Sequence, residues 1–287
     1  MKVEQIDDRK KVNKKVGYLG PEATFSHLVV KKRFPDWQHH SLGSIEDIIE
    51  FVKTFADGEE RIGLIPIENS TGGMILESVD LLLEEDFHLY IQEELSLNVQ
   101  LALIGRKGQE IKEIYSHPTP LFYCRKWLKT KFPLAKIQKT ASTSEAARIV
   151  SENPYSAALS TRLASEIYKL DILEFPVLEG NVNLTQFFVL SPFPYLGSTA
   201  ETTIVFSVKD EPGSLCSFLE PFRDGKLNIK RIVSRPIPGK LNTYLFLLSV
   251  QAGKESVPLE KALRKAEKYA IWLKSLGSYP IRETFNV

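Results

Sequence analysis

Apolar positions follow two different spacings between residues 16 and 190, and their alternation predicts strands and helices in turn. Short apolar runs, such as 16–20 and 61–68, are typical of buried strands. Residues 74–86 instead carry their apolar side chains along one stripe, as a helix does. Strands separated by helices of this length indicate an α/β fold with parallel sheets and helices on both faces. In such open sheets, ligands bind beyond the carboxyl ends of the strands.

A second pattern begins after residues 191–201, a stretch rich in Pro, Gly and Ser that is the best linker candidate. The pattern beyond it predicts, in order, a strand at 202–208, a helix at 214–225, strands at 228–236 and 243–253, a helix at 258–277 and a strand at 279–285. This βαββαβ order is that of a ferredoxin-like domain.

Composition excludes several classes of function. Lys and Arg number 37 against 36 Asp and Glu, so the charge gives no argument for binding nucleic acid. The widely spaced Cys124 and Cys216 suggest reduced thiols rather than a metal site or a disulfide. No apolar run approaches the ~18 residues of a transmembrane helix. The charged N-terminus also lacks the apolar core of a signal peptide, so we expect a cytoplasmic protein with no membrane partner.

The segment IPIENSTGG (65–73) contains candidate chemistry, because an apolar strand ends there in small polar groups. A strand end that passes into a helix exposes unpaired N–H groups, which favour an anion. Ser70, Thr71 and the two glycines would let a small anion approach the backbone. The chain has no Gly-x-x-x-x-Gly-Lys motif, so a carboxylate is a simpler ligand than a nucleotide phosphate. A helix cap formed by residues 69–71 explains the segment equally well.

Other polar positions occur at similar junctions. Thr24 and Ser26 follow the strand at 16–20 and, taken alone, predict a helix cap. His117 precedes another helix and is more often a structural hydrogen-bonding residue than a catalyst. Thr185 and Gln186 stand on an otherwise apolar strand, where a polar pair needs partners or a ligand.

Taken together, these segments resemble the prephenate dehydratase family in their order and approximate spacing. The matching segments are Gly20 to Ser26 (family Gly-Pro-x-Gly-Thr-[Tyr/Phe]-Ser), Ile67 to Ser70 (Ile/Val-Glu-Asn-Ser), His117-Pro118 with Cys124, Ser142-Thr143, and Asn183 to Phe187 (Asn-x-Thr-Arg-Phe). Each segment is weak alone, but their shared order is specific. The C-terminal unit is similar to the ACT regulatory domain that usually follows in this family.

The resemblance implies a two-lobed catalytic domain like that of periplasmic binding proteins, followed by an ACT domain. We therefore expect an N-terminal arm at 1–15, a catalytic domain at 16–192 and an ACT domain at 201–287. The second lobe of the catalytic domain is expected at about 97–178.

The resemblance also implies the reaction, in which prephenate loses water and carbon dioxide to give phenylpyruvate during phenylalanine biosynthesis. No cofactor and no metal are expected. Thr185 matches the threonine to which the family assigns proton delivery, a general-acid role. The residues expected to bind the substrate are Thr24, Ser26, Asn69, Ser70, Thr71, Gln186 and Phe187.

The sequence departs from the family pattern at four positions of this site. Gln186 replaces an arginine, Ala23 replaces a glycine, Tyr123 replaces a glutamine and Glu179 replaces an aspartate. A lost charge-assisted contact at residue 186 predicts substrate binding that is weaker by ~1.5–3 kcal/mol. Arg162 or Arg125 could supply the missing charge.

In the C-terminal unit, Gly213, Ser214 and Leu215 match one effector-binding segment of the family, and Ser234, Arg235 and Pro236 match the other. The resemblance implies that an amino acid, phenylalanine above all, binds between the ACT domains of two subunits of a homodimer or homotetramer. A dimerising domain without an effector is the alternative.

Three other functions stay open at this point. Arogenate dehydratase and prephenate decarboxylase are close enzymatic alternatives. A non-catalytic amino-acid sensor built on the same cleft is a third, and Thr185 beside Asn183 and Phe187 argues against it.

Overall fold

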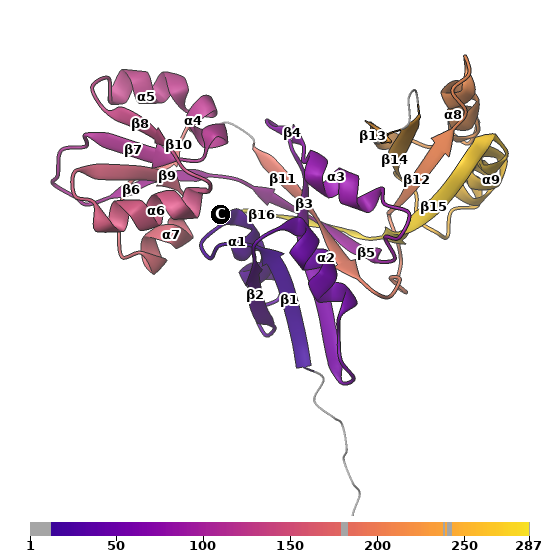
Figure 1. Ribbon diagram of the computed structural model, residues 1–287, viewed down its shortest axis with the longest axis horizontal. Coiled ribbons are helices and arrows are strands. Elements are labelled where there is room, and N and C mark those ends of the chain that lie inside the picture. The colour runs from indigo at the N-terminus through magenta and orange to yellow at the C-terminus, as the bar shows by residue number, and fades with distance from the viewer. Residues whose placement is uncertain (1–12, 179–182, 238, 240–242, 287) are drawn as a thin grey trace, which may run out of the picture.

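The computed structural model describes residues 13–178, 183–237, 239 and 243–286. A central lobe stands between a second lobe on one side and a small C-terminal domain on the other (Figure 1). Most of the predicted arm, residues 1–12, lies outside the described residues, as does Glu179. Its last three residues are the start of strand β1. No helix in the described ranges is both long and apolar enough to cross a membrane.

The central lobe contains a seven-stranded sheet in the order β16-β5-β11-β3-β1-β2, with β4 paired to β3. Its strands are β1 (Asn13–Leu19), β2 (Gln38–Leu42), β3 (Glu59–Asn69), β4 (Gly73–Met74), β5 (Tyr90–Asn98), β11 (Leu184–Ser191) and β16 (Ile281–Asn286). Its helices are α1 (Phe25–Arg33), α2 (Ile45–Lys53) and α3 (Leu76–Leu82). Strand β1 runs parallel to both neighbours, as predicted, whereas β11 runs antiparallel to β3 and β5.

The second lobe contains a five-stranded sheet in the order β10-β6-β9-β7-β8. Its strands are β6 (Leu101–Gly105), β7 (Glu113–Ser116), β8 (Lys136–Lys139), β9 (Ser156–Ser160) and β10 (Asp171–Val177). Its helices are α4 (Pro118–Tyr123), α5 (Arg125–Lys131), α6 (Thr143–Glu152) and α7 (Arg162–Ile167). The chain passes from β5 to β6 and returns to β11. These crossing segments are joined by the Val99 N–H, which donates to the Asn183 carbonyl at 2.7 Å.

The C-terminal domain has the predicted βαββαβ order, in an antiparallel sheet arranged β13-β14-β12-β15. Its elements are β12 (Glu201–Val208), α8 (Ser214–Asp224), β13 (Ile229–Pro236), β14 (Tyr244–Val250), α9 (Val257–Ala266), the 3₁₀ turn η1 (Glu267–Tyr269) and β15 (Ala270–Tyr279). Helices α8 and α9 cover one face of the sheet, where Phe206 stacks on Phe218 with centroids 3.7 Å apart.

The other face of this sheet packs on the central lobe. Leu247, Leu276 and Tyr279 share one apolar cluster with Ile91 and Phe188 of the central sheet, and all five are buried. Because buried apolar area is the main favourable term in association, this shared core fixes the C-terminal domain against the central lobe.

The structure corrects the prediction for the last elements. The helix predicted at 258–277 ends at Ala266, and β15 occupies residues 270–279. The strand predicted at 279–285 is β16, which pairs with β5 in the central sheet instead of completing the C-terminal domain. Strand β12 needs a second neighbour, and pairing with it overrides the helical spacing of residues 270–277.

Candidate functional site

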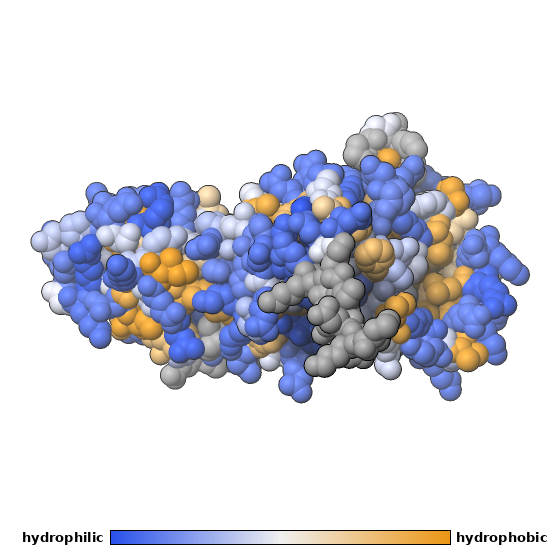
Figure 2. All heavy atoms as spheres, turned by 90° about the horizontal axis from the view of Figure 1, so that it is seen from below, coloured by the Kyte–Doolittle hydropathy of each residue, from blue (hydrophilic) through white to orange (hydrophobic). Residues whose placement is uncertain are grey.

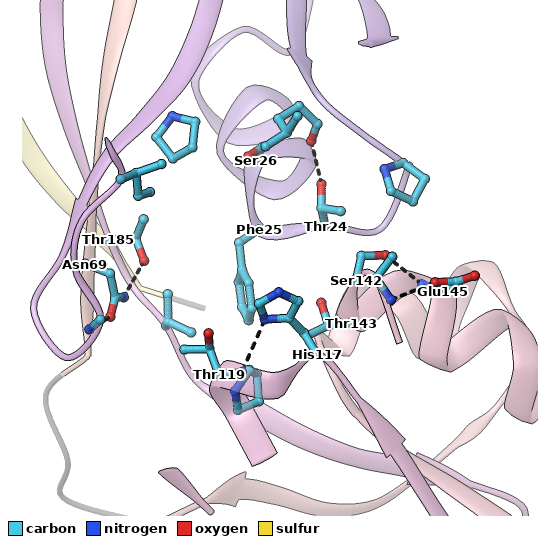
Figure 3. Close-up of a pocket in the computed structure, with 18 of the residues that line it drawn as sticks. Thr24, Phe25, Ser26, Asn69, His117, Thr119, Ser142, Thr143, Glu145 and Thr185 are labelled. Atoms are coloured by element: carbon cyan, nitrogen blue, oxygen red, sulfur yellow. Dashed lines mark hydrogen bonds between the residues drawn. The ribbon is translucent and has the colours of Figure 1, made fainter. Parts of the chain in front are cut away.

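A cleft of about 880 Å³ lies between the central and second lobes. Figure 3 shows polar side chains reaching it from both sides, Asn69 and Thr185 from the central sheet and His117 and Ser142 from the second lobe. Of the predicted substrate-binding and catalytic residues, Thr24, Ser26, Asn69, Thr185 and Phe187 line this cleft.

Asn69 and Thr185 face each other across the last paired positions of β3 and β11. The Asn69 amide donates to Thr185 Oγ1 at 2.9 Å and to Asn183 Oδ1 at 2.7 Å. The Thr185 oxygen is therefore an acceptor, and its own proton has no acceptor among the described residues. That proton is available to a molecule in the cleft.

The turn after β3 is organised by the same asparagine. Asn69 Oδ1 accepts from the N–H of Thr71 at 3.0 Å and of Gly72 at 2.7 Å, and from the Thr71 hydroxyl. The Ser70 N–H donates to the Leu184 carbonyl at 2.8 Å, and Ser70 Oγ accepts from the Leu184 N–H at 2.9 Å. This turn joins the ends of β3 and β11 and fixes the orientation of the Asn69 amide.

These bonds correct two expectations for residues 70 and 71. Ser70 and Thr71 are exposed and are not among the described residues that line the cleft, and their polar groups bond to the strand ends and the turn. The alternative of a helix cap is also wrong. Helix α3 starts later, at Leu76, and its N-cap residue Ile75 makes no side-chain cap.

The start of α1 forms the next part of the cleft wall. The Thr24 hydroxyl caps the helix by accepting from the His27 N–H at 3.3 Å and donates to the Leu19 carbonyl at 3.2 Å. Ser26 is buried and lines the cleft, and its hydroxyl has no partner among the described residues. Ala23, where the family has glycine, adopts a left-handed backbone with φ 67°. The Ala23 N–H donates to His27 Nδ1 at 3.0 Å.

The second lobe contributes two further helix N-termini. His117 caps α4, with Nδ1 accepting from the Thr119 N–H at 3.3 Å. Burial lowers the pKa of His117, so the ring is neutral at pH 7 and its remaining proton is on Nε2. Ser142 accepts from the Glu145 N–H at 3.0 Å while Glu145 accepts from the Ala141 N–H at 2.9 Å, a reciprocal capping arrangement at α6.

The starts of α1, α4 and α6 thus meet at one cleft, where partial positive charge from their N–H groups favours an anionic ligand. The sequence predicts a structural hydrogen-bonding role for His117, and both His117 and Ser142 cap helices. His117 and Ser142 follow β7 and β8, which are parallel neighbours in one sheet, whereas the start of α1 belongs to the central lobe. The sequence gives no sign that all three helix starts share a cavity, because elements of two lobes bring them together.

Side chains of the second lobe also bond directly to the central lobe. Thr161 Oγ1 donates to the Ala23 carbonyl at 2.9 Å, and the Ser144 hydroxyl donates to the Glu22 carbonyl. The Tyr123 hydroxyl donates to the Thr71 carbonyl. These contacts hold the lobes in the arrangement of Figure 3.

Gln186 was expected to bind the substrate, and the structure corrects this. Its side chain lies on the opposite face of β11 from Thr185, because successive side chains of a strand alternate. Gln186 Nε2 donates to Glu94 Oε1 at 2.9 Å, and its oxygen accepts from Arg231 of the C-terminal domain at 2.7 Å. The glutamine in place of the family's arginine is therefore a change at a domain interface, not in the cleft.

The proposed replacements for that charge also lie elsewhere. Arg125 stacks on Phe122 at 4.3 Å and Arg162 on Phe175 at 4.4 Å, and neither lines the cleft. Among the described residues that line the cleft, Arg148 of α6 is the one arginine or lysine.

The predicted effector-binding residues occupy two places in the C-terminal domain. Gly213, Ser214 and Leu215 start α8 and line a hollow of about 190 Å³. Ser234, Arg235 and Pro236 belong to β13, where Arg235 pairs with Asp80 of α3 at 2.8 Å. The part of the chain that the structure describes has no hollow lined by both segments, so an effector site formed by both stays a prediction.

Comparison with known proteins gives consistent matches. The family model described as prephenate dehydratase matches residues 16–193. The prephenate dehydratase of Methanocaldococcus jannaschii is 32% identical over 280 residues, which cover 94% of this chain and 99% of that protein.

Two solved structures have nearly the same fold as the whole chain. Prephenate dehydratase from Arthrobacter aurescens, in complex with L-Phe, superposes with a TM-score of 0.84 at 26% identity, covering 93% of this chain and 90% of that chain. GqqA, described as a novel type of quorum quenching acylase, superposes with a TM-score of 0.83, also at 26% identity, covering 93% and 98%.

Proposed function

The chain belongs to the prephenate dehydratase family, and we propose that its cleft is where prephenate loses water and carbon dioxide to give phenylpyruvate. The observation that carries this proposal is the Asn69–Thr185 hydrogen bond at the cleft wall, which leaves one hydroxyl proton free to be donated. Dehydration at C4 of prephenate, which carries a secondary, doubly allylic alcohol, needs one such proton.

Thr185 acts as the general acid in this proposal. Its proton goes to the C4 hydroxyl of prephenate, which leaves as water. The electron pair of the ring–carboxylate bond moves into the ring as carbon dioxide departs, so the ring becomes aromatic. The charge left on Thr185 Oγ1 is stabilised by the Asn69 amide until solvent returns the proton. A threonine hydroxyl is a weak acid, so this preorganised donor carries much of the effect.

The two carboxylates of prephenate need donors in the same cleft. Ser26, His117 and Arg148 line it, as do the starts of α1 and α6, and these groups suit an anion. Arg148 also pairs with Glu152 at 3.2 Å, so a substrate carboxylate would share or replace that partner. Arogenate differs in having an amino group on the side chain, and discrimination against it would depend on which of these groups faces that side chain.

We infer that phenylalanine regulates the enzyme. The L-Phe complex of the Arthrobacter aurescens relative supports an effector of this kind. In our proposal, Gly213 to Leu215 of one subunit and Ser234 to Pro236 of another enclose it, which requires a homodimer or homotetramer. The cytoplasmic location also stays a prediction.

The test is a turnover assay with prephenate and arogenate side by side, with and without phenylalanine. We expect the ultraviolet signal of phenylpyruvate from prephenate and a slower rate with phenylalanine. Carbon dioxide release without an aromatic product would instead identify a decarboxylase. Prephenate binding without any turnover would indicate a sensor.

The similarity to GqqA makes an N-acyl amide a useful third substrate. An acylase of the usual kind needs a nucleophile beside a base. Among the described residues that line the cleft, no hydrogen bond joins a hydroxyl to a histidine or to a carboxylate. We therefore expect no hydrolysis of that substrate.

A further inference from the structure

Arg231 of the C-terminal domain is a buried cation that reaches the central sheet from the face opposite the cleft. Only 4% of its surface is exposed. Its Nε donates to Glu68 Oε2 at 2.8 Å, its Nη1 to Glu94 Oε2 at 3.0 Å and its Nη2 to Gln186 Oε1 at 2.7 Å. One guanidinium therefore joins three neighbouring strands, β3, β5 and β11.

Two of these partners are neighbours of the catalytic pair in the same strands. Glu68 pairs with Gln186 across β3 and β11, and the next pair is Asn69 with Thr185. The side chains of the first pair bond to Arg231, whereas those of the second pair bond to each other at the cleft wall. On β3 and on β11, the residue that contacts Arg231 is thus the immediate neighbour of the residue at the cleft wall.

The network around Arg231 includes two further charged side chains, Lys230 and Glu201. Glu94 is fully buried and also accepts from Gln186 Nε2 at 2.9 Å and from Lys230 Nζ at 2.8 Å. Lys230 further pairs with the buried Glu201 at 2.8 Å. The buried members of this network keep their hydrogen-bond partners, because each lost bond would leave a desolvated charge unpaired.

We propose that Arg231 is a positioning residue for the Asn69–Thr185 pair, which it holds in place by fixing Glu68 and Gln186 from the other face of the sheet. This inference rests on the proposed function of Thr185. It makes the active site dependent on the docked C-terminal domain, although none of the described residues of that domain lines the cleft.

The fork shape of arginine, and not its charge alone, provides this hold. Three different nitrogens reach three different side chains, a geometry that the compact ammonium of lysine cannot reproduce. The informative variant is therefore Arg231→Lys, which keeps the cation beside buried Glu94 and with it the fold. Arg282→Met is the matched control, because it removes an arginine from Glu93 on the same strand β5 while Arg33 still pairs with that carboxylate.

The experiment uses the full chain and two readouts, turnover of prephenate and amide hydrogen exchange at Ser70 and Leu184, whose N–H groups bond across the strand ends. For Arg231→Lys we expect kcat to fall by about tenfold or more with a nearly unchanged KM, and faster exchange at both amides. Arg282→Met should match the unmodified chain in its turnover of prephenate and in its amide exchange at Ser70 and Leu184.

Wild-type kcat together with wild-type exchange in Arg231→Lys would overturn the proposal, as would an equal fall in kcat in Arg282→Met. If the unmodified chain does not turn over prephenate, the proposed function fails. The exchange rates would still decide whether Arg231 fixes the strand ends.

Discussion

Thr185 and Gln186 are consecutive residues of β11, yet their side chains lie on opposite faces of the central sheet. The Thr185 hydroxyl accepts from Asn69 at the cleft, whereas Gln186 bonds to Glu94 and to Arg231 of the C-terminal domain. A change at Thr185 should therefore act directly on the chemistry in the cleft, whereas a change at Gln186 should act through the interface with the C-terminal domain.

Replacing Thr185 with Ala removes the proposed acid. We expect kcat to fall by at least about a hundredfold, because general-acid catalysis contributes on that scale, while KM changes little. Steady-state kinetics with prephenate measures both. Thr185→Ser keeps a hydroxyl at this position and should retain much of the rate. An alanine variant with full turnover would remove Thr185 from the mechanism.

Replacing Asn69 with Asp separates its two roles. A carboxylate still accepts from the N–H groups of Thr71 and Gly72 but cannot donate to Thr185. It also adds a negative charge beside a dianionic substrate. We expect the unfolding temperature to stay near that of the unmodified chain while kcat/KM falls by about a hundredfold or more. Equal losses of folding and rate would mean that Asn69 is purely structural.

Replacing Gln186 with Ala tests the correction made by the structure. The change leaves Glu94 and Arg231 each without one partner at a buried interface. We expect a loss of about 1–3 kcal/mol in unfolding free energy by denaturant titration, with KM for prephenate unchanged. A large rise in KM without a loss of stability would return Gln186 to the substrate site.

Replacing Tyr123 with Phe removes a hydrogen bond between the lobes, from its hydroxyl to the Thr71 carbonyl. The arrangement of the two lobes seen in Figure 3 then loses about 0.5–1.5 kcal/mol of stability. The apparent affinity for prephenate falls with the population of that arrangement. We expect a rise in KM of a few-fold and little change in kcat. An unchanged KM would show that the lobes hold together without this contact.

His27 gives the fold a defined response to acid. Burial lowers the pKa of His27, and its Nδ1 must be unprotonated to accept from Ala23. The unfolded chain binds this proton near the ordinary value of about 6.5, so the folded state loses stability as the pH drops below that value. Denaturant titrations between pH 7 and 5 should show this fall. His27→Asn keeps an acceptor without the titration and should lessen the slope.

Much of the fold could be predicted from the spacing of apolar residues. The alternation of strands and helices and the βαββαβ order both follow from local pattern. The end of the chain could not, because residues 270–277 have apolar positions compatible with a helix. Only the open edge of β12, formed by residues distant in sequence, selects a strand there.

The site was predictable to a smaller extent. Motif resemblance located Asn69 and Thr185, which the structure joins by a hydrogen bond. It could not predict which face of the sheet each side chain lies on, because that depends on strand register. Ser70 and Gln186 were expected in the cleft for that reason, although one closes the strand ends and the other contacts Arg231.

The route of the last strand has a practical consequence for engineering. The polypeptide leaves the central sheet at the end of β11 and returns to it as β16, which pairs with β5. The C-terminal domain is therefore covalently connected to the central sheet at both of its ends. Deleting everything after the linker would also remove the edge strand β16 from the central sheet. Strand β5 would then be an exposed sheet edge, which is prone to pairing with another chain. An enzyme without the proposed phenylalanine response is better sought by point substitution than by truncation.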